Sequence, residues 1–397
     1  MADKTALQES SQALFCAIAD FLGLDASNKL LDIKKYNSYI DFKSKNQSAI
    51  TTASTRVISA GVTLRNIEDF LILNDDWFKS SVLIANALIR EISNIDNDFK
   101  IKSSGFQNIY YFRGDLEVMG NIQKLFTIAN KSVTLIKNQL PFGNINKWNP
   151  ADIYLASDKA KKEIKETAIK AKPNTFSFSN LNIMTSDLID SGDLLPLSLK
   201  KTTSSVNIQK VNFDRKKEIT MLKKISIKGV SDWKPYKPVK FGTKGSTRDI
   251  RIILNTGGDI KLRHDPSSKR FVAEFIGGGS EARGGSIGSI KVFCELMRFI
   301  DKDTANKVLK AYTEGEKQYL KEIEPVIKMR PLLNKKNPKL FDFQRGEISA
   351  ITIINKIMPI LKPWFSKKDE KVNGFIRIMY EYVTSRTKLS GKFIIAK

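Results

Sequence analysis

The sequence has few of the residues that build zinc centres and disulfide frameworks. Its 397 residues contain two cysteines, Cys16 and Cys294, and one histidine, His264. Two thiols are too few for a disulfide scaffold or a cysteine-based zinc site, and one imidazole excludes zinc sites built from several histidines. A Ser-His-Asp hydrolase would have to use His264. The low thiol content fits a reducing compartment, so we expect a cytoplasmic protein.

Long apolar runs are also missing. Spanning a bilayer takes roughly 18–20 apolar residues, but Asp20 interrupts the run 14–24 and Asp75 closes the run 70–73. The first ten residues lack the basic start and apolar stretch of an export signal. We therefore expect a soluble chain with no membrane partner.

Positive charge is abundant. Lysine and arginine outnumber aspartate and glutamate by 66 to 42, for a net charge of +24, while 41% of the residues are hydrophobic. That apolar content excludes a disordered chain. The charge creates a field that attracts polyanions, and nucleic acid is the commonest of these. The sequence leaves the oligomeric state open.

Hydrophobic patterning predicts three regions and an α/β (α+β) fold class. Region 1–218 has the pattern of an α/β domain with a mixed sheet flanked by helices, including a helix over 5–22 and strands over 152–157 and 193–201. Region 219–289 is a β-rich basic module that could extend the same sheet, and 290–397 is a helical carboxy-terminal region. The β-rich module is predicted from strand candidates at 219–227, 248–254, 260–263 and 270–276, with a hairpin turn at Gly257–Gly258. Within 25–75 the pattern assigns no element.

Two segments of the first region could supply metal-dependent chemistry on phosphodiesters. Asp152 opens an otherwise apolar strand, where an unpaired carboxylate is costly. In the second segment, strand alternation places Ser198 and Lys200 on the same side, opposite to leucines. Phosphodiester hydrolysis needs carboxylates to hold Mg²⁺ and a cation to stabilise the charge that develops on phosphorus.

These residues resemble the PD-(D/E)xK nuclease superfamily, including members encoded by bacteriophages. Pro150–Ala151–Asp152 is similar to the first half of the family motif with one inserted residue, and Ser198–Leu199–Lys200 is similar to the second half. The resemblance implies that Asp152 binds Mg²⁺ or Mn²⁺ and that Glu9, on the first helix, completes the metal shell. It also implies that Lys200 orients water or stabilises the phosphorane. Ser198 departs from the family pattern because it replaces an acid, so an inactive, degenerate site is an alternative.

Other interpretations of the same residues stay open. Asp152 could cap a turn, and Glu9 could simply stabilise the start of its helix. Lys200 and Lys201 could contact phosphate from a solvated strand end. Ser226–Ile227–Lys228 is a rival for the second half-motif.

Two further segments are candidates for nucleic-acid contact. The glycine-rich stretch 277–288 would let a backbone approach phosphate closely, and Arg283 could add a bidentate contact. Its spacing does not match a Walker motif, so nucleotide hydrolysis is not predicted. Basic residues interleaved with aromatic ones also suit nucleic acid, since they combine charge with stacking rings. The predicted nucleic-acid-binding residues are Lys201, Lys234, Lys237, Lys240, Lys244, Arg248 and Arg283.

The sequence thus predicts a Mg²⁺-dependent nuclease that hydrolyses DNA phosphodiester bonds, with DNA expected ahead of RNA. The alternative is a non-catalytic nucleic-acid-binding or virion structural protein with a degenerate nuclease-like fold. The protein would act in the cytoplasm, which for a phage-encoded chain means the host cell, or in the virion.

Overall fold

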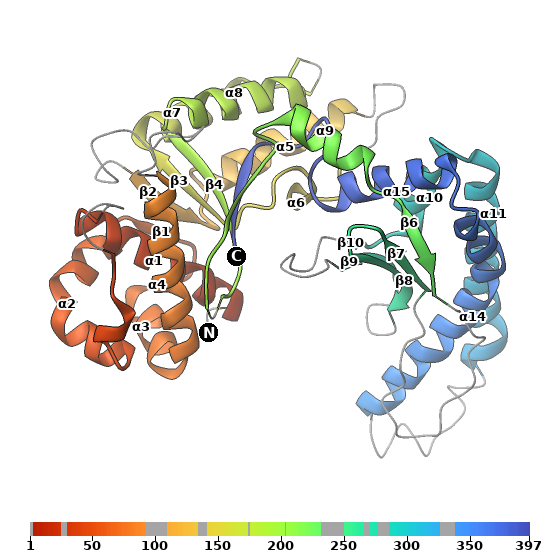
Figure 1. Cartoon of the computed structure of the whole chain (residues 1–397), viewed down its shortest axis with the longest axis horizontal. Coiled ribbons are helices and arrows are strands. Elements are labelled where there is room, and N and C mark those ends of the chain that lie inside the picture. Colours follow the sequence, from red (N-terminus) through yellow and green to blue (C-terminus); the bar gives the residue numbers. More distant parts are fainter. Residues whose placement is uncertain are drawn as a thin grey trace. The chain divides into compact units, whose positions relative to one another are not determined.

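The computed structural model describes most of the chain in two compact units. Unit 1 comprises Met1–Arg215 and Lys388–Lys397, and unit 2 comprises Lys216–Thr387 (Figure 1). The described residues are 3–24, 30–92, 109–133, 141–173, 175–202, 204–231, 250–265, 270–276, 286–325 and 338–397, with the side chains of 264–270 and 338–351 left out.

Unit 1 is built on a six-stranded mixed sheet. Its strand order is β1-β2-β3-β4-β11-β5. The β1/β2 and β4/β11 pairs are parallel and the other three pairs are antiparallel. The strands are β1 (Val57–Ser59), β2 (Ile109–Arg113), β3 (Ile153–Ser157), β4 (Leu194–Leu199), β11 (Phe393–Ala396) and β5 (Ile208–Val211). The predicted class, a mixed sheet flanked by helices, is confirmed.

Two groups of helices flank this sheet. The first is α1 (Lys4–Phe21), α2 (Tyr39–Ser54), α3 (Leu64–Leu73) and α4 (Asp75–Ile92), and the second is α5 (Met119–Val133), α7 (Asp158–Lys170) and α8 (Phe178–Asp190) (Figure 1). Helix α1 lies against β1 and β2 on one side and against α2, α3 and α4 on the other. Its buried Ala13, Cys16 and Ala17 are small, which lets the helix approach the sheet closely. The short helix α6 (Ile145–Trp148) precedes β3.

The central strands β3 and β4 are covered on both faces. All six residues of β4 are buried, as are four of the five in β3. A strand that is buried on both faces has a continuous run of apolar residues in its sequence, and β3 and β4 both show this pattern. A polar side chain at the end of such a strand therefore stands out from its surroundings.

Strand β11 lies between β4 and β5, although unit 2 separates it from both along the chain. Ile394 pairs with Leu197 of β4 and with Lys210 of β5. The backbone N of Lys200 donates to the carbonyl of Ala396 at 2.9 Å. The region 290–397, treated from its sequence as helical, thus ends in a strand of the first sheet. A run of four apolar residues indicates a buried strand but does not identify the strand with which it pairs.

Unit 2 contains a five-stranded antiparallel sheet with helices against one face. Its order is β10-β9-β8-β7-β6, and its strands are β6 (Ile227–Val230), β7 (Ile250–Leu254), β8 (Asp259–Asp265), β9 (Arg270–Ile276) and β10 (Ser286–Ile287). The buried residues alternate along β7, which leaves Arg251 and Ile253 exposed on the other face. On that face Arg263 pairs with Glu274 at 2.8 Å.

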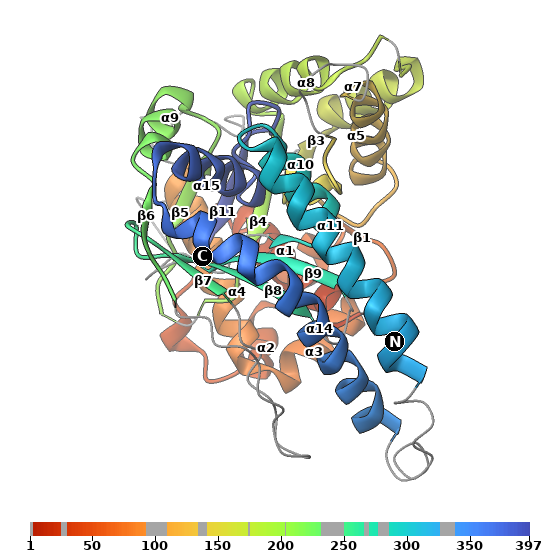
Figure 2. The same cartoon turned by 90° about the vertical axis from the view of Figure 1, so that its right-hand side faces the viewer.

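The helices in the described part of unit 2 are α9 (Arg215–Lys223), α10 (Ile290–Arg298), α11 (Lys302–Gln318) with a π-helical extension (Tyr319–Ile323), α14 (Pro338–Ser366) and α15 (Glu370–Val383). Helices α11 and α14 lie side by side, as Figure 2 shows. The strand predicted over 219–227 is wrong for its first part, because Arg215–Lys223 is a helix. Over a segment as short as Arg215–Lys223, a mixture of lysines and apolar residues is compatible with a helix and with a strand.

Within the described residues, no helix combines the length and the apolar character needed to cross a membrane.

Candidate functional site

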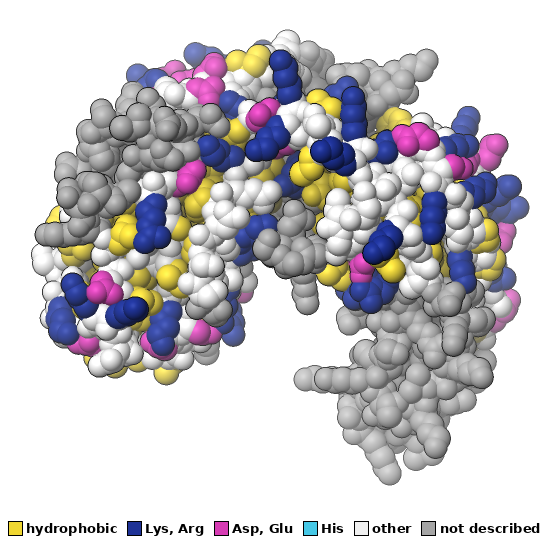
Figure 3. Space-filling model, viewed as in Figure 1, with side chains coloured by type: hydrophobic (Ala, Val, Ile, Leu, Met, Phe, Trp, Pro, Cys, Tyr) yellow, Lys and Arg dark blue, Asp and Glu magenta, His cyan; other side chains and the backbone are white. Residues whose placement is uncertain are grey.

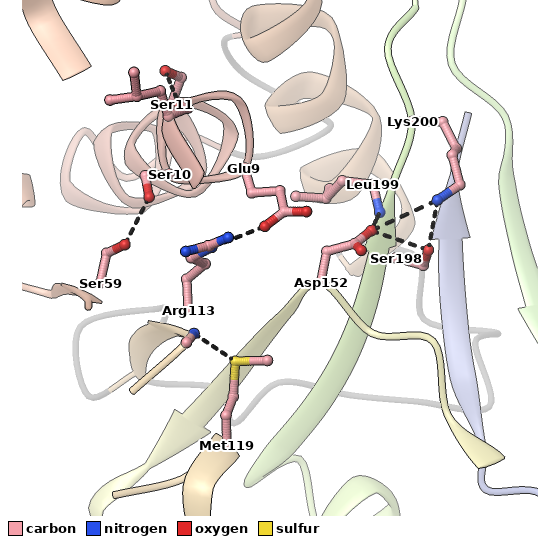
Figure 4. Close-up of polar contacts among 12 residues, drawn as sticks. Glu9, Ser10, Ser11, Ser59, Arg113, Met119, Asp152, Ser198, Leu199 and Lys200 are labelled. Carbon is pink, nitrogen blue, oxygen red and sulfur yellow. Dashed lines mark hydrogen bonds and ion pairs between the residues drawn. The ribbon is translucent and has the colours of Figure 1, made fainter. Parts of the chain in front are cut away.

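Asp152 stands directly before β3, with its carboxylate turned to the end of β4 (Figure 4). Its backbone N donates to the carbonyl of Leu197 at 2.9 Å, which continues the pairing of the two strands. The carboxylate oxygen Oδ2 accepts a hydrogen bond from the backbone N of Leu199 at 2.6 Å. The same oxygen accepts from Ser198 Oγ at 3.1 Å. The strand register therefore fixes this carboxylate against the backbone of β4.

Lys200 completes a chain of contacts on the same side of β4. Its Nζ donates to Ser198 Oγ at 3.2 Å and lies 3.8 Å from Asp152 Oδ2. The side chain of Lys200 is 43% exposed, so the amine can reach a bound substrate. The structure thus brings Asp152, Ser198 and Lys200 together at the ends of adjacent antiparallel strands.

Glu9 reaches this region from α1. Its Oε2 accepts from Arg113 Nε at 2.9 Å, and Arg113 is the last residue of β2. One residue further along α1, Ser10 Oγ bonds Ser59 Oγ of β1 at 2.8 Å, which fixes the rotation of the helix over the sheet. Figure 4 shows Glu9 between Arg113 and Asp152.

Burial raises the pKa of both carboxylates. Desolvation is the largest cause of the upward pKa shift of Asp152, and Lys200, the Leu199 N–H and Ser198 oppose it. For Glu9, desolvation again raises the pKa most, followed by the negative charge of Asp152, while Arg113 and Lys200 lower it. A carboxylate such as Glu9, whose charged form is destabilised by a second carboxylate, gains from a cation between the two.

The donor set fits a hard divalent cation. Carboxylate oxygens are the ligands that Mg²⁺ prefers, and Mg²⁺ usually keeps several waters, so two protein carboxylates are enough to bind it. Among the described residues, no group of three or more Asp, Glu, His or Cys side chains is placed to hold a metal ion. Glu9 and Asp152 are therefore the two acids that the described part of the chain offers here, and Ser198 adds a hydroxyl beside Asp152 rather than a third carboxylate.

Lys201, the described member of the predicted nucleic-acid-binding set, does not join this cluster. Lys201 forms an ion pair with Asp76, and its Nζ lies 5.3 Å from the centre of the Trp77 ring, so α4 holds this ammonium group. The rival half-motif Ser226–Lys228 belongs to unit 2, whereas Asp152 belongs to unit 1. The predicted contacts Lys234, Lys237, Lys240, Lys244, Arg248 and Arg283 lie outside the described residues.

Arg113 is a site residue that the sequence does not reveal. It comes 104 positions after the glutamate that it pairs with, at the end of a strand. The one local signal is that a positively charged residue follows directly after the apolar run Ile109–Phe112. A pattern of that kind also marks ordinary solvated strand ends, so only the fold identifies the contact.

Comparisons with protein-family models, with curated proteins and with solved structures find no match to this chain.

Proposed function

We propose that this chain is a divalent-cation-dependent nuclease that hydrolyses DNA phosphodiester bonds. The observation that carries the proposal is the convergence of Asp152, Ser198 and Lys200 within 3.8 Å, with the carboxylate of Glu9 beside them. A partly buried acid, a second acid and an amine at the end of a sheet are the groups that phosphodiester hydrolysis uses.

Each group of the site has a separate role in the proposed reaction. Asp152 and Glu9 hold Mg²⁺ or Mn²⁺, which supplies positive charge to the scissile phosphate. Lys200 orients the attacking water and stabilises the negative charge on the phosphorane. Ser198, which donates to Asp152 and accepts from Lys200, keeps the acid and the amine in register.

The charge of the protein supports a polyanionic substrate. The chain carries a net charge of +24. On the face that Figure 3 shows, lysine and arginine side chains are scattered over the described surface of both units rather than gathered in one patch. A field of this kind speeds the encounter with nucleic acid without selecting a sequence.

Incubation of the full chain with plasmid DNA and Mg²⁺ or Mn²⁺ is expected to convert supercoiled DNA to nicked or linear forms, and chelation by EDTA is expected to stop the reaction.

One observation favours the alternative, a non-catalytic nucleic-acid-binding protein: Ser198 occupies the place of an acid. Intact DNA with both metals, together with binding that weakens steeply with salt, would support that alternative.

Replacement Lys200→Met is expected to lower the cleavage rate by about a hundredfold, because the charge on the phosphorane loses the side-chain cation that stabilises it. The matched control is Lys165→Met, the same change on the exposed surface of α7, which should cleave like the wild type. Single-turnover rates at saturating Mn²⁺ make the comparison. Equal rates for the two variants would remove Lys200 from the reaction.

A further inference from the structure

Gln12 is a buried polar residue whose side-chain nitrogen lacks a partner. It lies in α1 with 1% of its surface exposed. Its side-chain Nε2 is buried and has no hydrogen-bond partner among the residues that the structure describes. An unpaired amide in a protein interior costs stability, so such a group calls for an explanation.

The other buried polar residues of α1 all have partners. Ser10 bonds Ser59, Ser11 Oγ donates to the carbonyl of Leu7, and Asp20 pairs with Arg56 at 2.9 Å. Gln12 is therefore an exception within a helix whose polar groups are otherwise satisfied.

The rotation of α1 places Gln12 on the side of the proposed active site. Successive residues of a helix are about 100° apart, so Ser10 lies about 100° from Glu9 in one direction and Gln12 about 60° in the other. Ser10 contacts β1 and Glu9 contacts β2. The sheet continues from β2 to β3 and β4, so this rotation carries Gln12 away from β1, to the side of the helix on which those strands follow.

The direction of side chains on a helix adds to this placement. Each Cα–Cβ bond tilts toward the amino terminus, so a residue covers the turn that precedes it. For Gln12 that turn contains Glu9. Figure 4 shows the Glu9 side chain on the same side of α1 as Asp152, with Ser10 pointing away toward Ser59.

We propose that Gln12 is part of the divalent-cation site, where its side-chain amide hydrogen-bonds a water of the coordination shell of the ion held by Glu9 and Asp152. The inference rests on the proposed function, because it takes from it the cation between the two acids. An amide can both donate to and accept from a water. Mg²⁺ keeps several waters when protein ligands are few, which is the case at a site where a serine replaces an acid.

The test uses Gln12→Met, a change that keeps the length of the side chain and removes its polar atoms. Without metal the variant is expected to melt about 2–4 °C higher than the wild type, because an unpaired buried amide is gone. Its affinity for Mn²⁺ is expected to fall about tenfold, the usual cost of removing a group that orients a metal ligand. A purely structural glutamine would give the opposite sign for stability and no change in affinity.

Gln47→Met is the matched control, since Gln47 is an exposed glutamine of α2. Calorimetry with Mn²⁺ on the full-length proteins measures affinity, and thermal melts in EDTA measure stability. An unchanged Mn²⁺ affinity in Gln12→Met, or a lower melting temperature, overturns the inference even if the wild type cleaves DNA. A weaker Mn²⁺ affinity with a higher melting temperature supports it even if the wild type leaves DNA intact, in which case only the proposed function fails. A wild type that does not bind Mn²⁺ overturns both.

Discussion

Replacement of Asp152 by asparagine is expected to lower DNA cleavage by about a thousandfold without loss of the fold. The amide oxygen of asparagine can still accept the hydrogen bonds from the Leu199 N–H and Ser198 Oγ, so the contact between the two strands survives. What disappears is the negative charge that would hold the cation. Single-turnover cleavage at a fixed Mn²⁺ concentration measures the loss, and Asp187→Asn, an exposed change in α8, is the control.

The same variant has a signature in the pH dependence of stability. Burial raises the pKa of Asp152 above its ordinary value of 3.8. At pH values between the unfolded-state and folded-state pKa, the carboxyl group keeps its proton in the folded protein but has lost it in the unfolded chain. The stability of the fold therefore falls as the pH rises through this range, and the contribution of the bound proton is gone above the folded-state pKa. The amide introduced by Asp152→Asn carries no charge at any pH, so without metal the variant should match the wild type in acid and melt higher at neutral pH.

Two results would contradict this account of Asp152. Full cleavage by Asp152→Asn would place the reaction elsewhere in the chain. A variant that melts lower than the wild type at neutral pH would show that the carboxylate stabilises the fold through its charge, as in an ordinary ion pair with Lys200.

The second large effect is expected from Ser198→Asp, which adds a third carboxylate to the site. Ser198 is 2% exposed and its Oγ lies 3.1 Å from Asp152 Oδ2. Without metal, two carboxylates at this distance repel each other in a buried place, so we expect the melting temperature to fall by about 5–10 °C. With Mn²⁺ the added ligand should reverse that loss and tighten cation binding by at least about tenfold.

Ser198→Asn is the control for Ser198→Asp, because it has the same shape without the charge. Thermal melts in EDTA and in a Mn²⁺ series separate the two contributions. If Mn²⁺ fails to recover the melting temperature of the aspartate variant while the asparagine variant behaves like the wild type, no cation binds beside position 198.

The sequence predicts the class of the fold and several of its elements because these depend on local patterns. The helix predicted over 5–22 is Lys4–Phe21, and the strand predicted over 270–276 is Arg270–Ile276. The hairpin glycine Gly257 has a φ of 85°, a conformation that favours glycine. Each of these signals is contained within a few neighbouring residues.

The parts that the sequence does not predict depend on contacts between distant segments. Strand β1 is three residues long and its burial shows no apolar alternation, so only its pairing with β2 reveals it. The placement of β11 beside β4 and the contact of Arg113 with Glu9 join residues about two hundred and about one hundred positions apart. Contacts over such separations produce no periodic pattern in the sequence, and Gln12 is not part of any sequence motif.

Unit 2 is inserted between two strands of one sheet, and this has a consequence for the moment at which the protein becomes active. On the ribosome, residues 216–387 are made after β5 and before β11. The backbone partner of Lys200 on β11 is Ala396, so a nascent chain that has emerged only as far as unit 2 lacks the strand that bonds the backbone of Lys200. For a chain with the proposed activity, the order of translation thus delays cleavage until β11 has been made.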